Sequence, residues 1–458
     1  RNSGHSLWRS WFLASGVQFV MAIEGLDTGD TAWVMTSSAL VLLMTPGLAF
    51  FYGGLVSSTN VLNTMMMSIT SMGVTSLIWM AVGFSVAFGE GPTAFTGDFR
   101  YAGLQGLETQ LWPGTAIPAL LFMVFQLTFA IIGVAIISGS VVGRIRFSAY
   151  VMFSVFWLPL VYAPVCHWVW GPGGWIDEMG AKDFAGGTVV HECTAVSALV
   201  LALCVGKRRQ DVATEGQAQQ AHNIPFVVLG AAILWFGWSG FNGGSALAAD
   251  EVAALALVNT YMSAGAALVA WMCLERAFAK RYSATGAVTG AVVGLVVVTP
   301  AAGFVTPLGA AAIGVLGCAL VFPCFRPSCF WAKWADDTLD AFPCHGVGGF
   351  VGTVLTGLFA TEGGLFYGGG FKLVGVQLLA AMATALYSAV GTLLIYSGLR
   401  LFMTMRVHED HELQGLDTVH HGEQAYYAHP SAPSSPMKTY QERLVEPETS
   451  EESTEEEE

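Results

Sequence analysis

Two histidines stand in long apolar stretches, each eight residues after an aspartate. His191 follows Asp183, and His345 follows Asp337. Ionisable side chains are costly within a membrane, so each of these histidines is a candidate functional residue. A neutral imidazole has one hydrogen-bond donor and one acceptor, so two rings can bond to each other, face a pore and relay a proton. A single buried histidine is more often structural, but a matched pair favours a functional role.

Phe129, Trp170 and Ser245 could form a binding site for a small cation. Aromatic faces attract a cation by about 0.5–2 kcal/mol each, and a hydroxyl can accept a bond from N–H. Aromatic residues at helix ends also serve as interfacial anchors, and this alternative applies to Trp168 and Trp170. The spacing alone leaves both roles open.

Glu192 directly follows the first histidine. One residue along an α-helix is a turn of about 100°, so Glu192 is predicted to point away from the pore. It is either a protonated or hydrogen-bonded glutamate packed between helices or an accessory proton acceptor for the histidines. A zinc-protease motif would need histidine at position 195, which is Ala195. The pairs Cys166-His167 and Cys344-His345 are adjacent residues that diverge on a helix, so no metal site is predicted.

The elements that carry these residues are predicted to be membrane-spanning helices. Of the 458 residues 54% are hydrophobic and 11% are charged, whereas roughly a quarter are charged in a soluble domain. A spanning helix needs about 20 apolar residues, and the chain has eleven such runs: 33–55, 62–88, 116–141, 148–169, 187–205, 224–246, 252–273, 284–299, 302–323, 345–361 and 373–403. We therefore expect an all-α integral membrane protein in contact with lipid.

Lysine and arginine are distributed unequally between the connections. If the first helix begins outside, three lie in outer connections (Arg100, Lys182 and Lys372) and twelve in inner ones: Arg144, Arg146, Lys207, Arg208, Arg209, Arg276, Lys280, Arg281, Arg326, Lys333, Arg400 and Arg406. Positive residues favour the cytoplasmic side. We expect a multi-pass protein of the cell membrane, with its N-terminus outside and its C-terminus in the cytoplasm.

The two halves of the chain are weakly similar. Phe51-Tyr52-Gly53-Gly54 ends the first span and Phe241-Asn242-Gly243-Gly244 ends the sixth, and the two aspartate–histidine pairs open spans five and ten. Five spans per copy is an odd number, so the second copy must insert upside down. This is the inverted repeat of many transporters, whose substrate sites lie near the membrane midplane. Chance similarity between glycine-rich helices is the alternative.

Both ends of the chain differ from the apolar body. Residues 1–30 contain only a short apolar run, typical of an extracellular or signal-like segment. We expect the transmembrane domain over 31–405, a cytoplasmic C-terminal region over 406–427 and a disordered acidic tail over 428–458, which is rich in proline, serine and glutamate. The eight cysteines lie almost wholly in apolar runs without CxxC spacing, so we expect reduced thiols.

The chain resembles the ammonium transporter (Amt/Mep/Rh) family, and its Amt branch in particular. Family motifs occur in family order from about residue 31 to 427: AWVMTSSALVLLMTPGLAFFYGGLV, CHWVWGPGGW, DFAGGTVVHECTAVSALV, GWSGFNGGSA, VNT, CHGVGGFVGTVLTGLFA and GLDTVHHGEQAY. The resemblance implies an eleven-helix protomer, with an inverted five-plus-five repeat and a final long helix, in a homotrimer whose protomers each have a pore. It implies ammonium uptake, with ammonia as the conducted species and the proton carried separately.

The resemblance also implies roles for individual residues. Phe129, Trp170 and Ser245 match the outer ammonium-recruitment site, and Phe129 and Phe241 match the stacked phenyl gate. His191 and His345 match the twin-histidine pair. Supporting roles fall on Asp183, which is expected to cap helix five, and on Gln126 and Trp238 near the vestibule. The expected apolar pore wall consists of Leu48, Ile136, Val190 and Ala341.

The connection Ser57-Ser58-Thr59-Asn60 lacks the basic residues of the family, so a cytoplasmic partner surface would differ from the family's at this connection. Lys207, Arg208 and Arg209 are kept in the loop of 206–223, where by resemblance a PII-type signalling protein could dock.

Two other functions stay open, an ammonium sensor or transceptor and a Rhesus-type ammonia gas channel. Trp170 beside Phe129 favours the Amt branch over the Rhesus branch. We expect no enzyme, because no nucleophile, metal or phosphate-loop constellation is present. We also expect no cofactor and no nucleic-acid partner.

Overall fold

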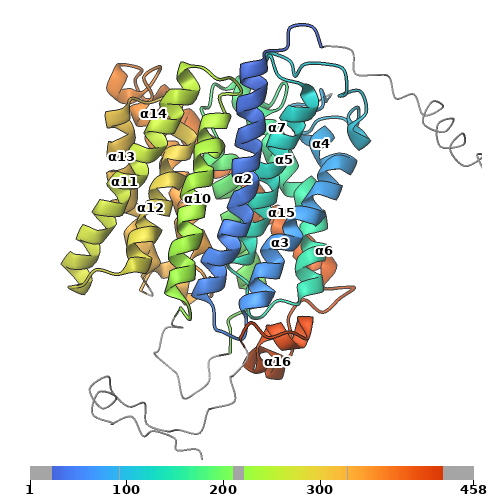
Figure 1. Cartoon of the computed structure of the whole chain (residues 1–458), viewed down its shortest axis with the longest axis vertical. Coiled ribbons are helices and arrows are strands. Elements are labelled where there is room, and N and C mark those ends of the chain that lie inside the picture. The colour runs from blue at the N-terminus through green and yellow to red at the C-terminus, as the bar shows by residue number, and fades with distance from the viewer. Residues whose placement is uncertain (1–22, 92, 210–220, 327, 427–458) are drawn as a thin grey trace, which may run out of the picture.

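The computed structural model describes residues 23–426 except 92, 210–220 and 327. The predicted segment 1–30 lies largely outside these residues, and the predicted acidic tail 428–458 lies wholly outside them. Within the described chain, eleven helical runs are long and apolar enough to cross a membrane, and no extended strand occurs. The predicted all-α membrane protein with eleven spans is confirmed (Figure 1).

Several spans are continuous helices, and others are broken by π or 3-10 turns. In chain order the spans are α2 (Thr28–Leu55), α3–η1–α4 (Val61–Ile78, Trp79–Gly83 and Phe84–Phe88), α5 (Ala119–Ser138), α6–η3–α7 (Phe147–Trp157, Leu158–Tyr162 and Ala163–Trp170), η4–α9 (Gly187–Glu192 and Cys193–Val205), α10 (Ile224–Gly244), α11 (Glu251–Ala279), α12–η6 (Ala284–Val298 and Thr299–Ala301), α13 (Pro307–Val321), η9–α14 (Phe342–Val347 and Gly348–Phe359) and α15 (Lys372–Leu399). The connections hold the short helices η2 (Ala102–Leu104), α8 (Trp175–Glu178), η7 (Phe322–Phe325), η8 (Phe330–Lys333) and η10 (Leu365–Tyr367).

The predicted span ends differ from the observed ones by a few residues. The largest differences at a helix start are in α13, which begins at Pro307 rather than near residue 302, and in α2, which begins at Thr28 rather than near residue 33. The Asp27 carboxylate accepts a bond from the Asp30 amide at 2.9 Å, so a polar cap lengthens the helix beyond its apolar run. Hydropathy reports the part of a helix that lies in lipid and misses such capped ends.

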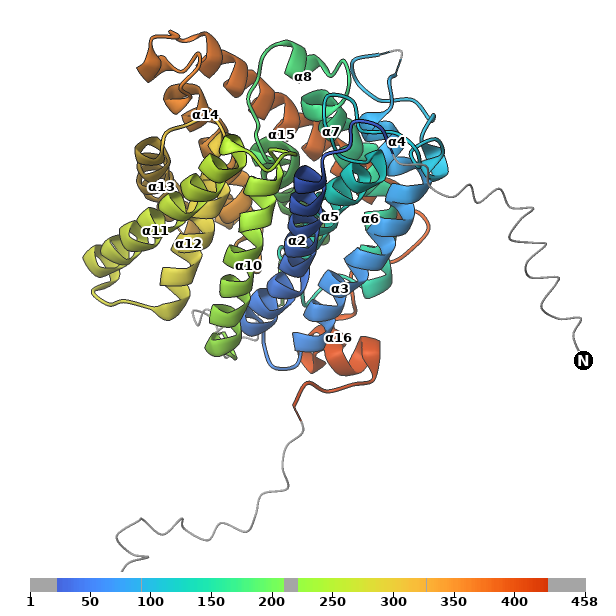
Figure 2. The same ribbon diagram turned by 45° about the horizontal axis from the view of Figure 1, so that its top comes forward.

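The first helices of the two repeats, α2 and α10, lie along each other (Figure 2). Glycines allow this close approach. A Cβ atom added to Gly230 on α10 would lie 2.2 Å from the Phe51 amide nitrogen on α2, and one added to Gly54 on α2 would lie 2.6 Å from the Asn223 carbonyl oxygen. Small residues at helix contacts of this kind are typical of membrane proteins.

The spans that carry the two histidines both begin with a π-helical turn. η4 contains His191 and η9 contains His345. An aspartate caps each turn: Asp183 accepts bonds from four backbone amides at residues 186–189, and Asp337 accepts bonds from Ala341 and Phe342. Widened turns are frequent at functional sites. The inverted repeat therefore extends to the local geometry of both turns.

We call the face that carries Thr28 the outer face and the opposite face the inner face, following the predicted orientation. On the inner face the C-terminal helices α16 (Glu409–Gln414) and η11 (Asp417–His421) lie below α3 (Figure 1). The Asp417 carboxylate accepts a bond from the Asn63 amide at 2.8 Å, and the His421 ring contacts Asn63 at 3.2 Å. The C-terminal region is thus attached to the first repeat.

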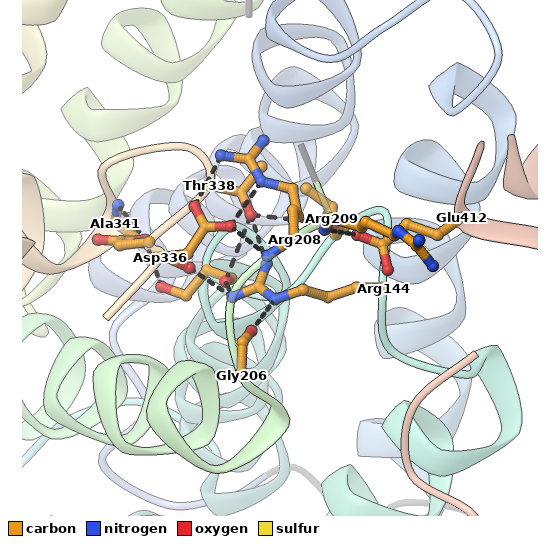
Figure 3. Close-up of polar contacts among 11 residues, drawn as sticks. Arg144, Gly206, Arg208, Arg209, Asp336, Thr338, Ala341 and Glu412 are labelled. Carbon is orange, nitrogen blue, oxygen red and sulfur yellow. Dashed lines mark hydrogen bonds and ion pairs between the residues drawn. The ribbon is translucent and has the colours of Figure 1, made fainter. Parts of the chain in front are cut away.

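A buried arginine joins the inner connections of both repeats (Figure 3). The guanidinium of Arg144 donates to the carbonyl oxygens of Gly206 (2.6 Å) and Asp336, and to the Thr338 hydroxyl (2.7 Å). Beside it, Arg208 forms an ion pair with the Asp336 carboxylate at 2.7 Å. Burial raises the pKa of Asp336, but the hydrogen bonds and charge of Arg208 outweigh burial, so that the pKa is lowered.

Candidate functional site

The outer cavity has a volume of about 270 Å³ and opens on the outer face. Three of its lining residues, Phe129, Trp170 and Ser245, are the predicted cation-binding residues, and Gln126 lines it as well. The Gln126 Oε1 atom is buried and has no hydrogen-bond partner within the described chain. Such an orphaned acceptor is costly unless a donor occupies the cavity. The cavity can therefore accept hydrogen bonds from a solute with N–H or O–H groups.

Aromatic rings form the floor of the outer cavity. The Phe129 and Phe241 rings are stacked with centroids 4.1 Å apart and planes 19° apart. The Trp170 ring meets Phe129 edge to face, with 6.1 Å between centroids. Its Nε1 donates to the Asp183 carbonyl oxygen at 2.8 Å, which fixes the orientation of the indole. The two stacked phenyl rings separate the outer cavity from the space below.

The two histidine rings lie in contact below the phenyl pair. Their Nδ1 atoms are 3.2 Å apart, and their centroids are 5.2 Å apart with planes at 25°. The His191 ring also stacks on Trp238, at 5.3 Å between centroids. Trp238 is itself held by a bond from its Nε1 to the Thr299 hydroxyl at 2.9 Å. The two repeats thus bring His191 and His345 to one place.

A second, much smaller cavity lies beside the histidines. Its volume is about 10 Å³, which is roughly the room needed for one water molecule. Apart from the two rings its lining is apolar, with Met44, Leu48, Phe51, Ile132, Ile136, Leu234, Trp238, Phe241 and Val292. A water-sized neutral molecule fits this inner cavity, whereas a hydrated ion does not.

The lining differs in part from the expected pore wall. Leu48 and Ile136 contribute as expected, but Val190 and Ala341 are buried outside the lining. Val190 packs against Gly186, which takes a positive φ of 110° at the start of η4. The wall residues Met44, Ile132 and Val292 were not anticipated, because apolar residues on apolar helices carry no distinguishing signal.

Two acidic residues that line open cavities were also not anticipated from the sequence. The exposed Asp177 of α8 lines the outer cavity, and Asp340 lines an open recess on the inner face with Leu55 and Ile224. Burial and, to a smaller extent, the neighbouring Asp337 raise the pKa of Asp340 to about 8. Asp177 belongs to no motif that would indicate a site. Asp340 could not be distinguished by sequence from the acidic residues that precede it.

Glu192 lies outside both cavities, as its position one residue after His191 predicts. No group of three or more potential metal ligands gathers among the residues that the structure describes. All eight cysteines lie within the described residues, and none of them forms a disulfide bond.

Comparisons with known proteins agree with this architecture. The model of the "Ammonium Transporter Family" matches residues 32–426. The chain is 45% identical over 418 residues to an ammonium transporter of Bacillus subtilis (strain 168), covering 88% of this chain and 99% of that protein. It is 46% identical to an ammonium transporter of Aquifex aeolicus (strain VF5), covering 89% and 96%.

Solved structures show the same fold. Mep2 of Candida albicans superposes with a TM-score of 0.80 at 32% identity, covering 90% of this chain and 94% of that one. A protein described as "Sensor Amt Protein" superposes with a TM-score of 0.80 at 30% identity, covering 86% and 98%. The chain belongs to the ammonium transporter family and has its eleven-helix fold, with an inverted five-plus-five repeat and a final long helix.

Proposed function

We propose that the protein moves ammonium across the membrane by recruiting it in the outer cavity, removing a proton and conducting ammonia past the two histidines. The observation that carries this proposal is the order of the two cavities and the phenyl pair from the outer face inward. A polar and aromatic cavity is followed by a stacked phenyl pair and by an apolar cavity for one water-sized molecule beside two imidazoles. The relatives' names supply the substrate.

Ammonium has the properties that the outer cavity would recognise. Its positive charge is attracted to the faces of Phe129 and Trp170, by about 0.5–2 kcal/mol per ring. Its N–H groups can donate to the unpartnered Gln126 Oε1 and to Ser245, whose hydroxyl donates its own hydrogen to the Phe241 carbonyl at 2.8 Å and so presents lone pairs. The Asp177 carboxylate at the mouth adds attraction for cations.

The phenyl pair and the apolar cavity would then select by charge. An ion that stays charged loses its hydration in the inner cavity and gains no counter-charge there. Ammonium can escape this cost by giving up a proton, because ammonia is neutral. Potassium has a similar size but has no proton to lose, so the same path excludes it.

The histidine pair would supply the hydrogen bonds that ammonia loses on leaving water. One Nδ1 must donate and the other accept across the 3.2 Å contact, so one Nε2 is left as an acceptor and the other as a donor. The His191 Nε2 is buried without a partner in the described chain, as expected for an atom that faces a passing solute. Both rings are therefore held in complementary tautomers.

The proposal extends to the assembly, the orientation and the partner of the protein. We propose a homotrimer in the cell membrane, with the N-terminus outside, a transmembrane domain over 31–405 and a cytoplasmic region over 406–427. A PII-type protein is the candidate partner of the inner face, where Lys207, Arg208 and Arg209 begin the loop. No catalytic step on a substrate is proposed, because ammonium transport changes only a protonation state.

The test is the current produced by ammonium pulses on reconstituted protein, adsorbed on a solid-supported membrane, with potassium pulses for comparison. Wild type should give current with ammonium only. His191→Ala with His345→Ala should lose this current or its selectivity, because the inner cavity loses its polar groups. His408→Ala is the matched control, since this exposed histidine caps α16 and lines neither cavity.

Wild-type protein that binds ammonium but gives neither current nor uptake would contradict transport. That result would favour the sensor, a function that the name of one structural neighbour suggests. Ammonia uptake without any current would favour a gas channel.

A further inference from the structure

Glu192 is a buried carboxyl group that the proposed pore does not use. It is 1% exposed, forms none of the ion pairs found in the described chain, and its Oε2 has no hydrogen-bond partner there. It lines neither cavity. A lone carboxylate is costly in such a place, so burial favours the neutral, protonated form.

The register between η4–α9 and α15 places Glu192 relative to the last helix. The Lys182 amide donates to Gln377 Oε1 at 2.7 Å, the Cys193 thiol lies beside the Ser388 hydroxyl, and the Tyr396 hydroxyl donates to the Cys204 carbonyl at 2.9 Å. The two helices therefore run side by side in the same direction. Glu192, one residue before Cys193, lies between the levels of Thr384 and Ser388.

A stripe of buried polar residues runs down this side of α15. Gln377, Thr384, Ser388 and Thr392 are all 0% exposed, and their spacing of seven, four and four residues puts them on one helix face. The hydroxyls of Thr384 and Thr392 have no partner in the described chain, and the Ser388 hydroxyl has only the weakly bonding thiol of Cys193 beside it. On α14, the hydroxyl of Thr353 is unpartnered as well, and the Thr353 carbonyl accepts a bond from Gln377 Nε2 at 3.1 Å.

Several other buried hydroxyls of this protein bond within their own helix, although within the described chain Ser37, Thr45, Ser68 and Thr75 on α2 and α3 are unpartnered as well. Thr356 donates to the Gly352 carbonyl at 2.9 Å, and Ser197 donates to the Cys193 carbonyl at 2.8 Å. The α15 hydroxyls could do the same but do not. A row of unsatisfied hydroxyls beside an unsatisfied carboxyl group indicates a path for water molecules or protons.

We propose that Glu192 and the α15 stripe of Thr384, Ser388 and Thr392 form a proton route behind the pore. This inference rests on the proposed function, because it gives a path to the proton that ammonium leaves behind. At the outer site an N–H bond of ammonium breaks, and ammonia enters the pore with the electron pair. Glu192 passes its own proton to the stripe toward the inner face, and the proton released from ammonium then reprotonates Glu192 from the outer side.

The step is balanced: one ammonium outside becomes one ammonia and one proton inside, and Glu192 ends as it began. The titratable groups that interact with Glu192 are Asp183 at the start of η4 and Cys193 next to it, and Tyr387 on α15 interacts in turn with Cys193. The Tyr387 hydroxyl is used in a bond to the Leu160 carbonyl at 2.9 Å, and Asp183 is used as a cap. Glu192 is thus the buried acid in this region whose oxygen is left unpartnered.

The test measures ammonia entry and charge movement on the same proteoliposomes. Ammonia entry is followed as nitrogen-15-labelled ammonia plus ammonium accumulated inside the vesicles, with the membrane potential clamped, and charge movement by the current after an ammonium pulse. For Glu192→Gln we expect the current to fall by about 100-fold, the lower range for loss of a proton-transfer group, while ammonia entry changes little. Glu192→Asp should keep part of the current.

Glu275→Gln is the matched control, because Glu275 on α11 has its own partners, the Ser283 amide and hydroxyl. It should leave both readouts unchanged. Infrared difference spectra on adding ammonium give a readout independent of transport, and a protonated-carboxyl band should be present in wild type and absent in Glu192→Gln.

An unchanged current in Glu192→Gln overturns the route, and so does an equal loss of both readouts in folded protein, which would make Glu192 a support of the pore. If Glu192→Gln does not fold, the double variant Thr384→Val with Ser388→Ala is judged by the same two readouts. Wild type without any ammonium-dependent flux would overturn the proposed function itself, which is a different outcome.

Discussion

At the scale of single residues, Asp183 shows how one carboxylate builds the site without entering a cavity. It accepts bonds from four amides at the start of η4 and from the Thr188 hydroxyl, while its carbonyl oxygen holds Trp170. The cap therefore fixes both the outer aromatic ring and the turn that presents His191. Its position eight residues before the histidine, repeated at Asp337, made it recognisable in the sequence.

Replacing Asp183 with asparagine should destabilise the protein by at least about 2 kcal/mol, because the amide group offers one acceptor atom in place of two charged oxygens. The measurement is the thermal unfolding midpoint in detergent. Asp27→Asn makes the same change at the cap of α2, where asparagine caps equally well, and should shift the midpoint little. Equal midpoints for both variants would show that the Asp183 cap is no stronger than an exposed one.

The site was predictable from the sequence where a residue is polar in an apolar helix. His191, His345 and Gln126 stand out in this way, and the repeat indicated that the histidines meet. The apolar wall was not predictable, because which of many leucines, isoleucines and valines face a cavity depends on helix rotation. In η4 a π-turn changes that rotation, which explains why Val190 lies outside the lining.

At the scale of elements, the contact of α2 with α10 depends on glycine. The eleven spans could be predicted from hydropathy alone, because each must cross the same thickness of lipid. Their pairing could not, since apolar helices carry little information about their neighbours. The close backbone contact at Gly230 shows what determines the pairing of α2 with α10. A side chain at this position would collide with main-chain atoms of Gly47 and Phe51.

We expect Gly230→Ala to lower stability by about 1–3 kcal/mol, as overpacking does in a tight core. Gly265→Ala on α11 is the control, because a Cβ atom there meets nothing within 4 Å, and alanine there should be neutral or slightly stabilising. Both variants are compared by thermal unfolding and by the yield of monodisperse protein. A Gly230→Ala protein as stable as the Gly265→Ala protein would mean that the two helices separate at no cost.

At the scale of the whole molecule, Arg144 holds the inner connections of both repeats together (Figure 3). It is 0% exposed, and burial lowers its pKa to about 10, so it keeps its charge at neutral pH. Its bonds to Gly206 and Asp336 link the connection after α9 with the connection before η9. Arg209 and Arg406 extend this network to the C-terminal region through Glu409 and Glu412.

Arg144→Met should cost about 3–5 kcal/mol of stability, because the Asp336 carboxylate loses a neighbouring charge and buried carbonyl oxygens lose their donor. Arg100→Met is the control. Arg100 pairs with Glu90 and Asp98 on the outer surface, where such pairs contribute about 0–1 kcal/mol. The measurement is thermal unfolding of both variants. A loss of stability no larger in Arg144→Met than in Arg100→Met would refute the structural role of the network.

The inner cavity has room for about one water-sized molecule, and this has an energetic consequence for a cell. A continuous file of water cannot form past the histidines, so the pore offers no standing wire along which hydronium could discharge the membrane potential. In the absence of ammonium, any proton leak through the protein is therefore confined to the separate route proposed through Glu192, where the proton must first leave a buried carboxyl group.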